Sequence, residues 1–168
     1  MNLQAKLWID QYGMLPHPEG GYFVETLLAP DHIAIEDRPT RPLYSSILFL
    51  LSDLDVSHFH TLQSDEVWYY QNGDPLDIVV IDEDGVLEVI HLGPFRNQVM
   101  QALVRKGCVF GSLVPNHGAS LVGCMVSPGF LFEEFTLHTQ TELILRYPEH
   151  QEWIEKLTKS EVEEEIEG

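Results

Sequence analysis

The middle of the sequence holds the side-chain types that could do chemistry. They recur at a two-residue period: His58 and His60, then Glu66, Trp68 and Tyr70. On a strand, residues two apart project from the same face. If the two strands pair as a hairpin, we expect one surface to carry two imidazoles, a carboxylate and two aromatic rings.

This set of side chains is compatible with three kinds of function. Imidazole and carboxylate can move protons, so His60 would be the base and Tyr70 the acid of a metal-independent isomerase or epimerase. The same groups can ligate Fe, Mn, Ni or Zn, with His58, His60 and Glu66 as ligands of a divalent metal. Finally, rings beside polar groups suit a binding module without turnover, for a small carbohydrate-like or carbonyl ligand. The residues alone leave these three alternatives open.

A second segment, Pro16 to Gly21, combines stiffness with unusual backbone freedom. Its prolines restrict the chain, whereas its two glycines permit backbone angles that a side chain would forbid. We expect it to hold Glu19 and Tyr22 at the mouth of the site, where both would bind substrate, together with His58, Glu66 and Trp68.

The remaining histidines and the cysteines carry weaker signals. His17, His117 and His138 lie among turn-forming residues, and we expect them to be exposed and without a role. Cys108 and Cys124 lie within apolar runs, which predicts buried and inert thiols.

Short apolar runs alternate with Gly, Pro, Asp and Asn clusters from residue 22 onward, a pattern typical of strands. A chain with many short strands in one domain favours a β-sandwich or barrel. The predicted strands are Tyr22–Leu27, Ser45–Leu51, Ser57–Thr61, Glu66–Gln71, Leu76–Ile81, Val86–Leu92, Val99–Val104, Val109–Val114, Ser120–Val126 and Glu134–Leu137.

The pattern is helical at both ends of the chain. Apolar residues recur at helical spacing up to Tyr12, and Gly13 is suited to end that helix in a left-handed conformation. We therefore divide the chain into an N-terminal helix (1–14), a barrel domain (15–138), and a C-terminal helical segment with an acidic tail (139–168). From residue 161 the tail is mostly Glu, and we expect it to be disordered.

Composition narrows the classes of partner. The 168 residues include nine Lys and Arg against 27 Asp and Glu, a formal net charge of -18. This charge repels phosphate backbones and anionic lipid head groups, so we expect neither nucleic acid nor a membrane as partner. Two cysteines cannot form a disulfide framework, and no signal peptide is legible. These features predict a reduced, cytoplasmic protein.

The first motif resembles a known superfamily. His58-x-His60, then Glu66 and Gly73, is similar to the first sequence motif of the cupins. The resemblance implies an all-β fold, the double-stranded β-helix or cupin jelly-roll barrel, with a short N-terminal helix and C-terminal helices. Where metal-binding cupins have a further His in their second motif, this chain has Phe110. The resemblance therefore implies a site without a cofactor, and a divalent metal stays the alternative.

Three more segments resemble one branch of the cupins, a small family named only as a domain of unknown function. They are PHPEGGY at 16–22, SDEVW at 64–68 and SPGF at 127–130. The family is similar in fold to jelly-roll deoxysugar epimerases, which use a His as base and a Tyr as acid without metal. This similarity implies those roles for His60 and Tyr70, and it implies a homodimer.

Overall fold

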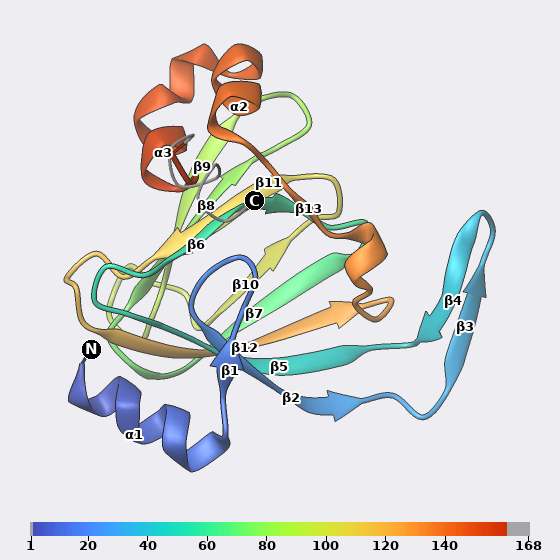
Figure 1. Ribbon diagram of the computed structural model, residues 1–168, viewed down its shortest axis with the longest axis horizontal. Helices are drawn as coiled ribbons and strands as arrows, with labels where there is room; N and C mark the ends of the chain where they lie inside the picture. Colours follow the sequence, from blue (N-terminus) through green and yellow to red (C-terminus); the bar gives the residue numbers. More distant parts are fainter. Residues whose placement is uncertain (1, 161–168) are drawn as a thin grey trace.

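Two antiparallel sheets face one another in the computed structural model, which describes residues 2–160 (Figure 1). The larger sheet has six strands in the order β1 (Leu15–Pro16), β2 (Tyr22–Leu28), β5 (Ser45–Ser52), β12 (Ala119–Ser127), β7 (Asp65–Gly73) and β10 (Gln101–Val104). The smaller sheet has the order β13 (Thr136–Leu137), β6 (Val56–Thr61), β11 (Val109–Leu113), β8 (Leu76–Ile81) and β9 (Leu87–Leu92). The all-β prediction is confirmed, and each predicted run contains strand residues.

The main core lies between the two sheets. Alternate residues of the strands point inward, so Phe49 and Trp68 of the larger sheet meet Phe110 of the smaller one, all fully buried. The ring centroids of Phe49 and Trp68 lie 6.0 Å apart in an edge-to-face arrangement, which favours the aromatic quadrupoles. Burying such apolar surface is the dominant favourable contribution to folding.

Helices cover the outer faces of both sheets. Helix α1 (Leu3–Tyr12) packs Trp8 against the larger sheet, and it ends at Gly13 in the predicted left-handed conformation (φ 64°). Helices α2 (Gln140–Arg146) and α3 (Gln151–Lys156), joined by the short 3-10 helix η2 (Pro148–His150), cover the smaller sheet. None of the helices within residues 2–160 is long and apolar enough to cross a bilayer. The predicted tail from residue 161 lies outside the described residues.

The predicted hairpin of the two motif strands is wrong. Strand β6 pairs with β11 and β13 in the smaller sheet, whereas β7 pairs with β12 and β10 in the larger one. Residues 62–64 carry the chain from one sheet to the other, as jelly-roll connections do. His60 and Glu66 therefore project toward each other from opposite walls of the barrel.

A hairpin that the sequence pattern does not predict extends from the barrel as an arm. It consists of β3 (His32–Ile35) and β4 (Arg38–Pro42) and projects to the right in Figure 1. Pro39 and Pro42 in β4 weaken the strand pattern of the sequence, because proline is confined to edges and ends of strands. The predicted strand that began at Glu134 is shorter, since residues 132–134 form the 3-10 helix η1 (Phe132–Glu134).

Candidate functional site

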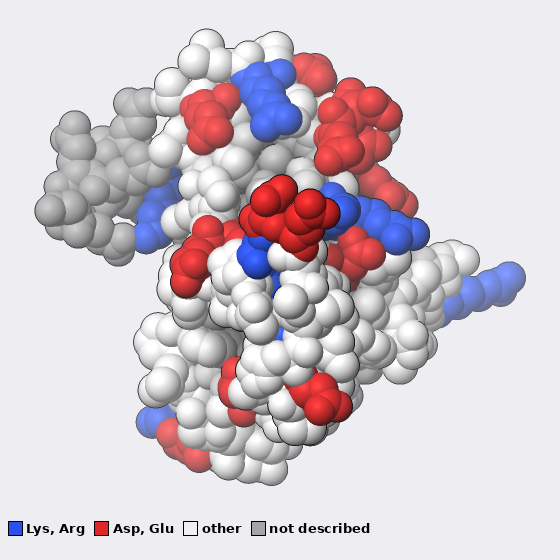
Figure 2. All heavy atoms as spheres, turned by 90° about the vertical axis from the view of Figure 1, so that its right-hand side faces the viewer, with Lys and Arg blue, Asp and Glu red and all other residues white. Residues whose placement is uncertain are grey.

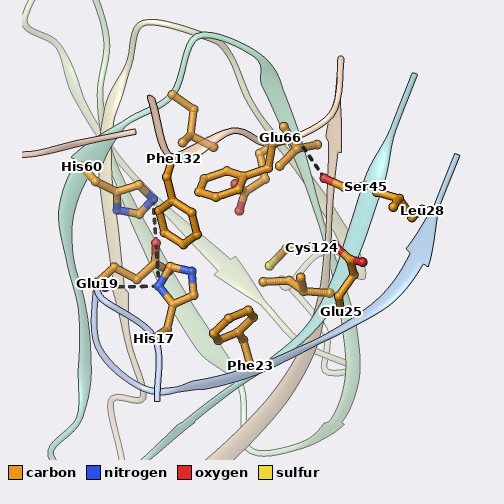
Figure 3. Close-up of a pocket in the computed structure, with 14 residues that line it drawn as sticks. His17, Glu19, Phe23, Glu25, Leu28, Ser45, His60, Glu66, Cys124 and Phe132 are labelled. Carbon is orange, nitrogen blue, oxygen red and sulfur yellow. Dashed lines mark hydrogen bonds and ion pairs between the residues drawn. The ribbon is translucent and has the colours of Figure 1, made fainter. Parts of the chain in front are cut away.

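A cavity of about 140 Å³ lies between the two sheets near one end of the barrel (Figure 3). A volume of this order takes up a molecule about the size of benzene. Three carboxyl groups, two imidazoles and three phenyl rings line it. The lining residues are His17, Glu19, Phe23, Glu25, Leu28, Ser45, Ile47, His60, Leu62, Glu66, Cys124, Val126, Phe130 and Phe132.

Glu19 is the best-connected group of the site. Its Oε2 atom lies 3.1 Å from Nε2 of His60 and 3.7 Å from Nδ1 of His17. Its Oε1 atom accepts a hydrogen bond of 2.9 Å from the hydroxyl of Ser57. Burial raises the pKa of the Glu19 carboxyl, which opposes the smaller influences of His17 and Ser57. The predicted loop thus brings a buried acid against two imidazoles.

Two glycines allow the loop that carries Glu19 to enter the barrel. Gly20 and Gly21 have φ values of 110° and 70°, which L side chains rarely adopt. A Cβ atom on Gly20 would overlap the carbonyl oxygen of Val56, so only glycine fits there. The loop is tied further by His58, whose backbone N–H and Nδ1 both bond the carbonyl of Glu19 at 2.7 Å.

His60 is oriented by its own strand. Its Nδ1 atom lies 2.7 Å from the carbonyl of His58, and since a carbonyl only accepts, Nδ1 carries a proton. The neutral ring therefore presents the bare Nε2 atom to Glu19. Burial lowers the pKa of His60 to about 4, although its backbone hydrogen bond acts in the opposite direction. A protonated Glu19 bonded to a neutral His60 satisfies both groups.

The expectation that His17 is exposed is wrong. The ring is buried and reaches into the cavity between Glu19 and Phe23 (Figure 3). Its Nδ1 accepts a hydrogen bond of 3.1 Å from the backbone N–H of Glu19, which leaves Nε2 as the nitrogen that donates. Burial lowers its pKa, so the ring favours the neutral form. The same expectation is wrong for His138, which is buried and bonded to Thr61 at 2.7 Å.

Glu66 lies on the opposite wall, in strand β7. It is buried, and its carboxyl lies beside the thiol of Cys124 and the indole of Trp68, which both act to lower its pKa. Burial raises the pKa of Glu66 well above its usual value, and the nearby carboxyl of Glu19 raises it further. The pKa of Cys124 is raised as well, chiefly by burial. The cavity therefore holds a second carboxyl that favours its protonated, hydrogen-donating form.

The other predicted site residues lie away from the cavity. Trp68 and Tyr70 share a face with Glu66, as their spacing predicts, but both fill the barrel behind it. Tyr70 lies about 13 Å along the strand from Glu66, and its hydroxyl donates to the carbonyl of Gly73 at 2.7 Å. Tyr22 packs on the α1 side of the larger sheet. Residues 23 and 25, which alternate with Tyr22, reach the cavity instead.

A metal site built from His58, His60 and Glu66 does not fit this geometry. His60 and Glu66 line the cavity, but His58 does not, and its ring is bonded to the Glu19 backbone. Phe110 stands at the position of the further metal-binding His, and its ring centroid lies 4.2 Å from the ring centroid of His60. Within residues 2–160, no three His, Cys, Asp or Glu side chains converge as a metal ligand set does.

Ion pairs connect η1, which forms one wall of the cavity, to the arm. Arg38 and Arg41 of β4 both bond the carboxyl of Glu134; Arg38 Nε and Arg41 Nη2 lie 2.9 and 2.7 Å from Oε1. These charge-assisted bonds lower the pKa of Glu134 to about 2. Two residues before Glu134, Phe132 lies against the cavity. The ion-pair cluster therefore holds an aromatic wall of the site in place.

Comparisons with known proteins agree with this fold. The family model described as "Cupin superfamily (DUF985)" matches residues 6–138. A hypothetical protein from Leishmania major is 36% identical, with a TM-score of 0.86, over 93% of this chain and 99% of that one. A Shewanella oneidensis protein is 40% identical, also with a TM-score of 0.86, over 96% of this chain and 99% of its own.

Two further proteins are more distant. An uncharacterized protein from Saccharomyces cerevisiae is 28% identical over 145 residues, 76% of this chain and 72% of the yeast protein. Oxalate decarboxylase from Bacillus subtilis is 12% identical with a TM-score of 0.55, over 87% of this chain and 37% of that enzyme. At this identity the likeness shows the jelly-roll fold alone.

Proposed function

Because this chain belongs to the cupin superfamily (DUF985), we propose that its barrel binds a small carbonyl compound and moves a proton at the carbon beside the carbonyl, as isomerases and epimerases do. The supporting observation is that Glu19 and Glu66 line one small cavity from different walls, and both have raised pKa values. Titratable groups with perturbed pKa values in a cavity are typical of acid–base catalysis.

In this proposal Glu19 takes the proton from carbon in its carboxylate form. The new carboxylic acid then bonds Nε2 of His60, which lies 3.1 Å away. The N–H of His17 at Nε2 would stabilise the negative charge that develops on the carbonyl oxygen, as a neutral imidazole can. Glu66, on the opposite wall, returns a proton to the other face of the carbon. The base role predicted for His60 thus passes to Glu19, and the acid role predicted for Tyr70 passes to Glu66.

The cavity restricts the substrate. Of the residues that line it, all within the described part of the chain, none is Lys or Arg. Phosphate and diphosphate groups need such cations or clustered backbone amides. The proposed substrate is therefore a small carbonyl compound that lacks a phosphate, rather than a nucleotide sugar.

Proton exchange with solvent tests the proposal. Hydroxyacetone, glyceraldehyde and related small hydroxycarbonyl compounds are incubated with the protein in D₂O, and loss of the carbon-bound proton is followed by NMR. We expect exchange above background for at least one compound, and its loss in His60→Ala and Glu66→Gln. Glu88→Gln, an exposed carboxyl on β9, is the matched control and should exchange as the wild type does.

The same experiment separates the alternative, a binding module without turnover. If a compound binds, seen as broadening of its NMR signals, but gains no deuterium, the chain binds without catalysing and the proton-transfer proposal fails. His60→Ala would then change affinity by less than about tenfold, or 1.4 kcal/mol.

We also propose the homodimer that the resemblance implies. Leu27 and Tyr44 are exposed on the outer face of the larger sheet, beside a groove lined by uncharged side chains. In a chain of net charge -18, two copies repel least through such a face. Light scattering after size exclusion should give twice the monomer mass, and Tyr44→Glu should return it to the monomer.

A further inference from the structure

The geometry of the same cavity points to the chemical class of its ligand: we infer that the cavity binds a small organic cation, a carbonyl compound that also carries a protonated or methylated amino group. This inference rests on the proposed function for the carbonyl, but the cation is argued from other features of the site. They are the sign of its charges, the arrangement of its rings and the charge of the chain.

The side chains that line the cavity can supply negative charge but no positive charge. Glu19, Glu25 and Glu66 contribute three carboxyl groups, whereas the two imidazoles favour their neutral form because of burial. Buried carboxyls are normally paired with a cation. Glu19 has His60 and Ser57 as partners, and Glu66 has the thiol of Cys124 and the indole of Trp68 beside it. None of these partners is a cation, since His60 favours its neutral form. Burial favours the protonated, neutral forms of Glu19 and Glu66. A cationic ligand beside them would lower their pKa values and bind to the resulting carboxylates.

Aromatic rings surround the place that such a cation would occupy. Phe23 meets the ring of His17 edge to face, with centroids 4.7 Å apart. Phe130 and Phe132 meet in the same way at 4.8 Å, and Phe132 lies 6.5 Å from His17. A cation within about 6 Å of the face of such a ring is attracted by its quadrupole. Rings on several sides combined with carboxyls form a cage for an ammonium group.

The surroundings add to this preference. Glu25 is exposed and lines the cavity from β2, two residues beyond Phe23. On the face that bears the arm, Figure 2 shows acidic side chains spread over the surface. With a net charge of -18, the chain attracts cations from solution and concentrates them at a concave site.

A matched pair of probes tests the inference. Choline and 3,3-dimethylbutan-1-ol have the same shape and differ in one charge, and each has about as many heavy atoms as the cavity accepts. We expect the full-length protein to bind choline at least about tenfold more tightly than the neutral alcohol in calorimetry. The preference should fall as salt is added, because ions screen the charges.

Variants test which side chains produce the preference for choline over the neutral alcohol. Glu25→Gln should reduce the preference for choline to less than about threefold and leave the affinity for the neutral alcohol unchanged, because the amide keeps the shape. Phe132→Leu should also lower it, since leucine fills space without a ring quadrupole. Glu88→Gln, an exposed carboxyl of β9, removes the same charge elsewhere and should leave the preference intact.

Equal affinity for the two probes, tighter binding of the alcohol, or binding of neither would each overturn the inference. These outcomes are separate from those of the proposed function. Deuterium exchange into hydroxyacetone without a preference for choline would overturn only the inference that the ligand is a cation. A preference for choline without deuterium exchange into any carbonyl compound, aminoacetone included, would overturn only the proposal of proton transfer at carbon.

Discussion

The carboxyl of Glu19 and the imidazole of His60 form a bonded pair inside the barrel, with Oε2 and Nε2 3.1 Å apart. Because Nδ1 of His60 donates to the carbonyl of His58, the neutral ring can only accept at Nε2. The single proton of the pair then resides on Glu19, as the raised pKa of Glu19 and the lowered pKa of His60 both favour. When the pair loses this proton, Glu19 becomes a base that faces the cavity.

Glu19→Gln should therefore stop proton exchange. The amide has nearly the same size and can still donate to His60, but it cannot accept a proton from carbon. We expect the exchange rate, measured by NMR in D₂O, to fall by about 10²–10⁴-fold. Ser57→Ala removes one hydrogen bond to Glu19 and should reduce the rate far less. Exchange at the wild-type rate in Glu19→Gln would show that another group accepts the proton.

The stability of Glu66→Gln relative to the wild type should depend on pH. Burial raises the pKa of folded Glu66 well above its usual 4.5, so between those two pKa values the folded chain binds more protons than the unfolded chain. The wild type then loses up to about 1.4 kcal/mol per pH unit as pH rises through this interval. The amide does not titrate, so Glu66→Gln should become the more stable protein as pH rises.

Urea unfolding at pH 5, 7 and 8.5 measures this difference in the free energy of unfolding. Glu88→Gln, at an exposed position of β9, should keep a constant offset from the wild type over the same range. A constant offset for Glu66→Gln as well would mean that Glu66 is ionised in the folded protein, contrary to its burial.

The two-residue period predicted which faces of the strands carry chemistry, but not how deep each residue lies. Glu66, Trp68 and Tyr70 do share one face. Only Glu66 reaches the cavity, because depth depends on the position along the strand and on what the facing sheet supplies. Local periodicity contains no information on the facing sheet. For the same reason the residue pattern predicts one hairpin for the strands of His60 and Glu66, although the two strands lie in different sheets.

The contribution of the N-terminal loop was predicted in part. The two glycines indicated an unusual backbone at Glu19, and both have positive φ values. His17 was missed because an isolated His between prolines is typical of an exposed turn. Its burial results from Phe23 and Phe49, whose rings meet its ring edge to face. The pairing of Phe49 with Phe23 between β5 and β2 is a non-local contact.

The ion pairs of Glu134 should contribute unequally to stability. The side chain of Arg41 is 0% exposed, whereas that of Arg38 is 22% exposed. Glu134→Gln leaves the buried Arg41 without its carboxylate and should cost about 3 kcal/mol in urea unfolding at pH 7. Arg38→Gln leaves the Arg41 pair intact and should cost about 1 kcal/mol or less. Equal losses of unfolding free energy in the two variants would mean that the buried Arg41 does not depend on the Glu134 carboxylate.

The same variant has a pH signature. Because the pKa of folded Glu134 is about 2, below its usual value of 4.5, the stability that its charge contributes is fully present above pH 4.5. It is lost as pH falls from 4.5 toward 2. The wild type and Glu134→Gln should therefore converge in stability over this interval. A gap that stays constant down to pH 2.5 would contradict the assignment.

Two glycine-to-alanine changes should separate backbone strain from steric overlap. Gly13 and Gly20 both have positive φ, at 64° and 110°. A Cβ atom on Gly13 meets nothing within 4 Å, whereas one on Gly20 would overlap the Val56 carbonyl oxygen. We expect Gly13→Ala to cost about 1–2 kcal/mol from the left-handed conformation alone. Gly20→Ala should cost more and, because it displaces Glu19, should also suppress proton exchange, whereas Gly13→Ala should not. Equal unfolding midpoints and equal exchange rates in the two variants would show that the loop accommodates the Cβ atom at position 20 without moving Glu19.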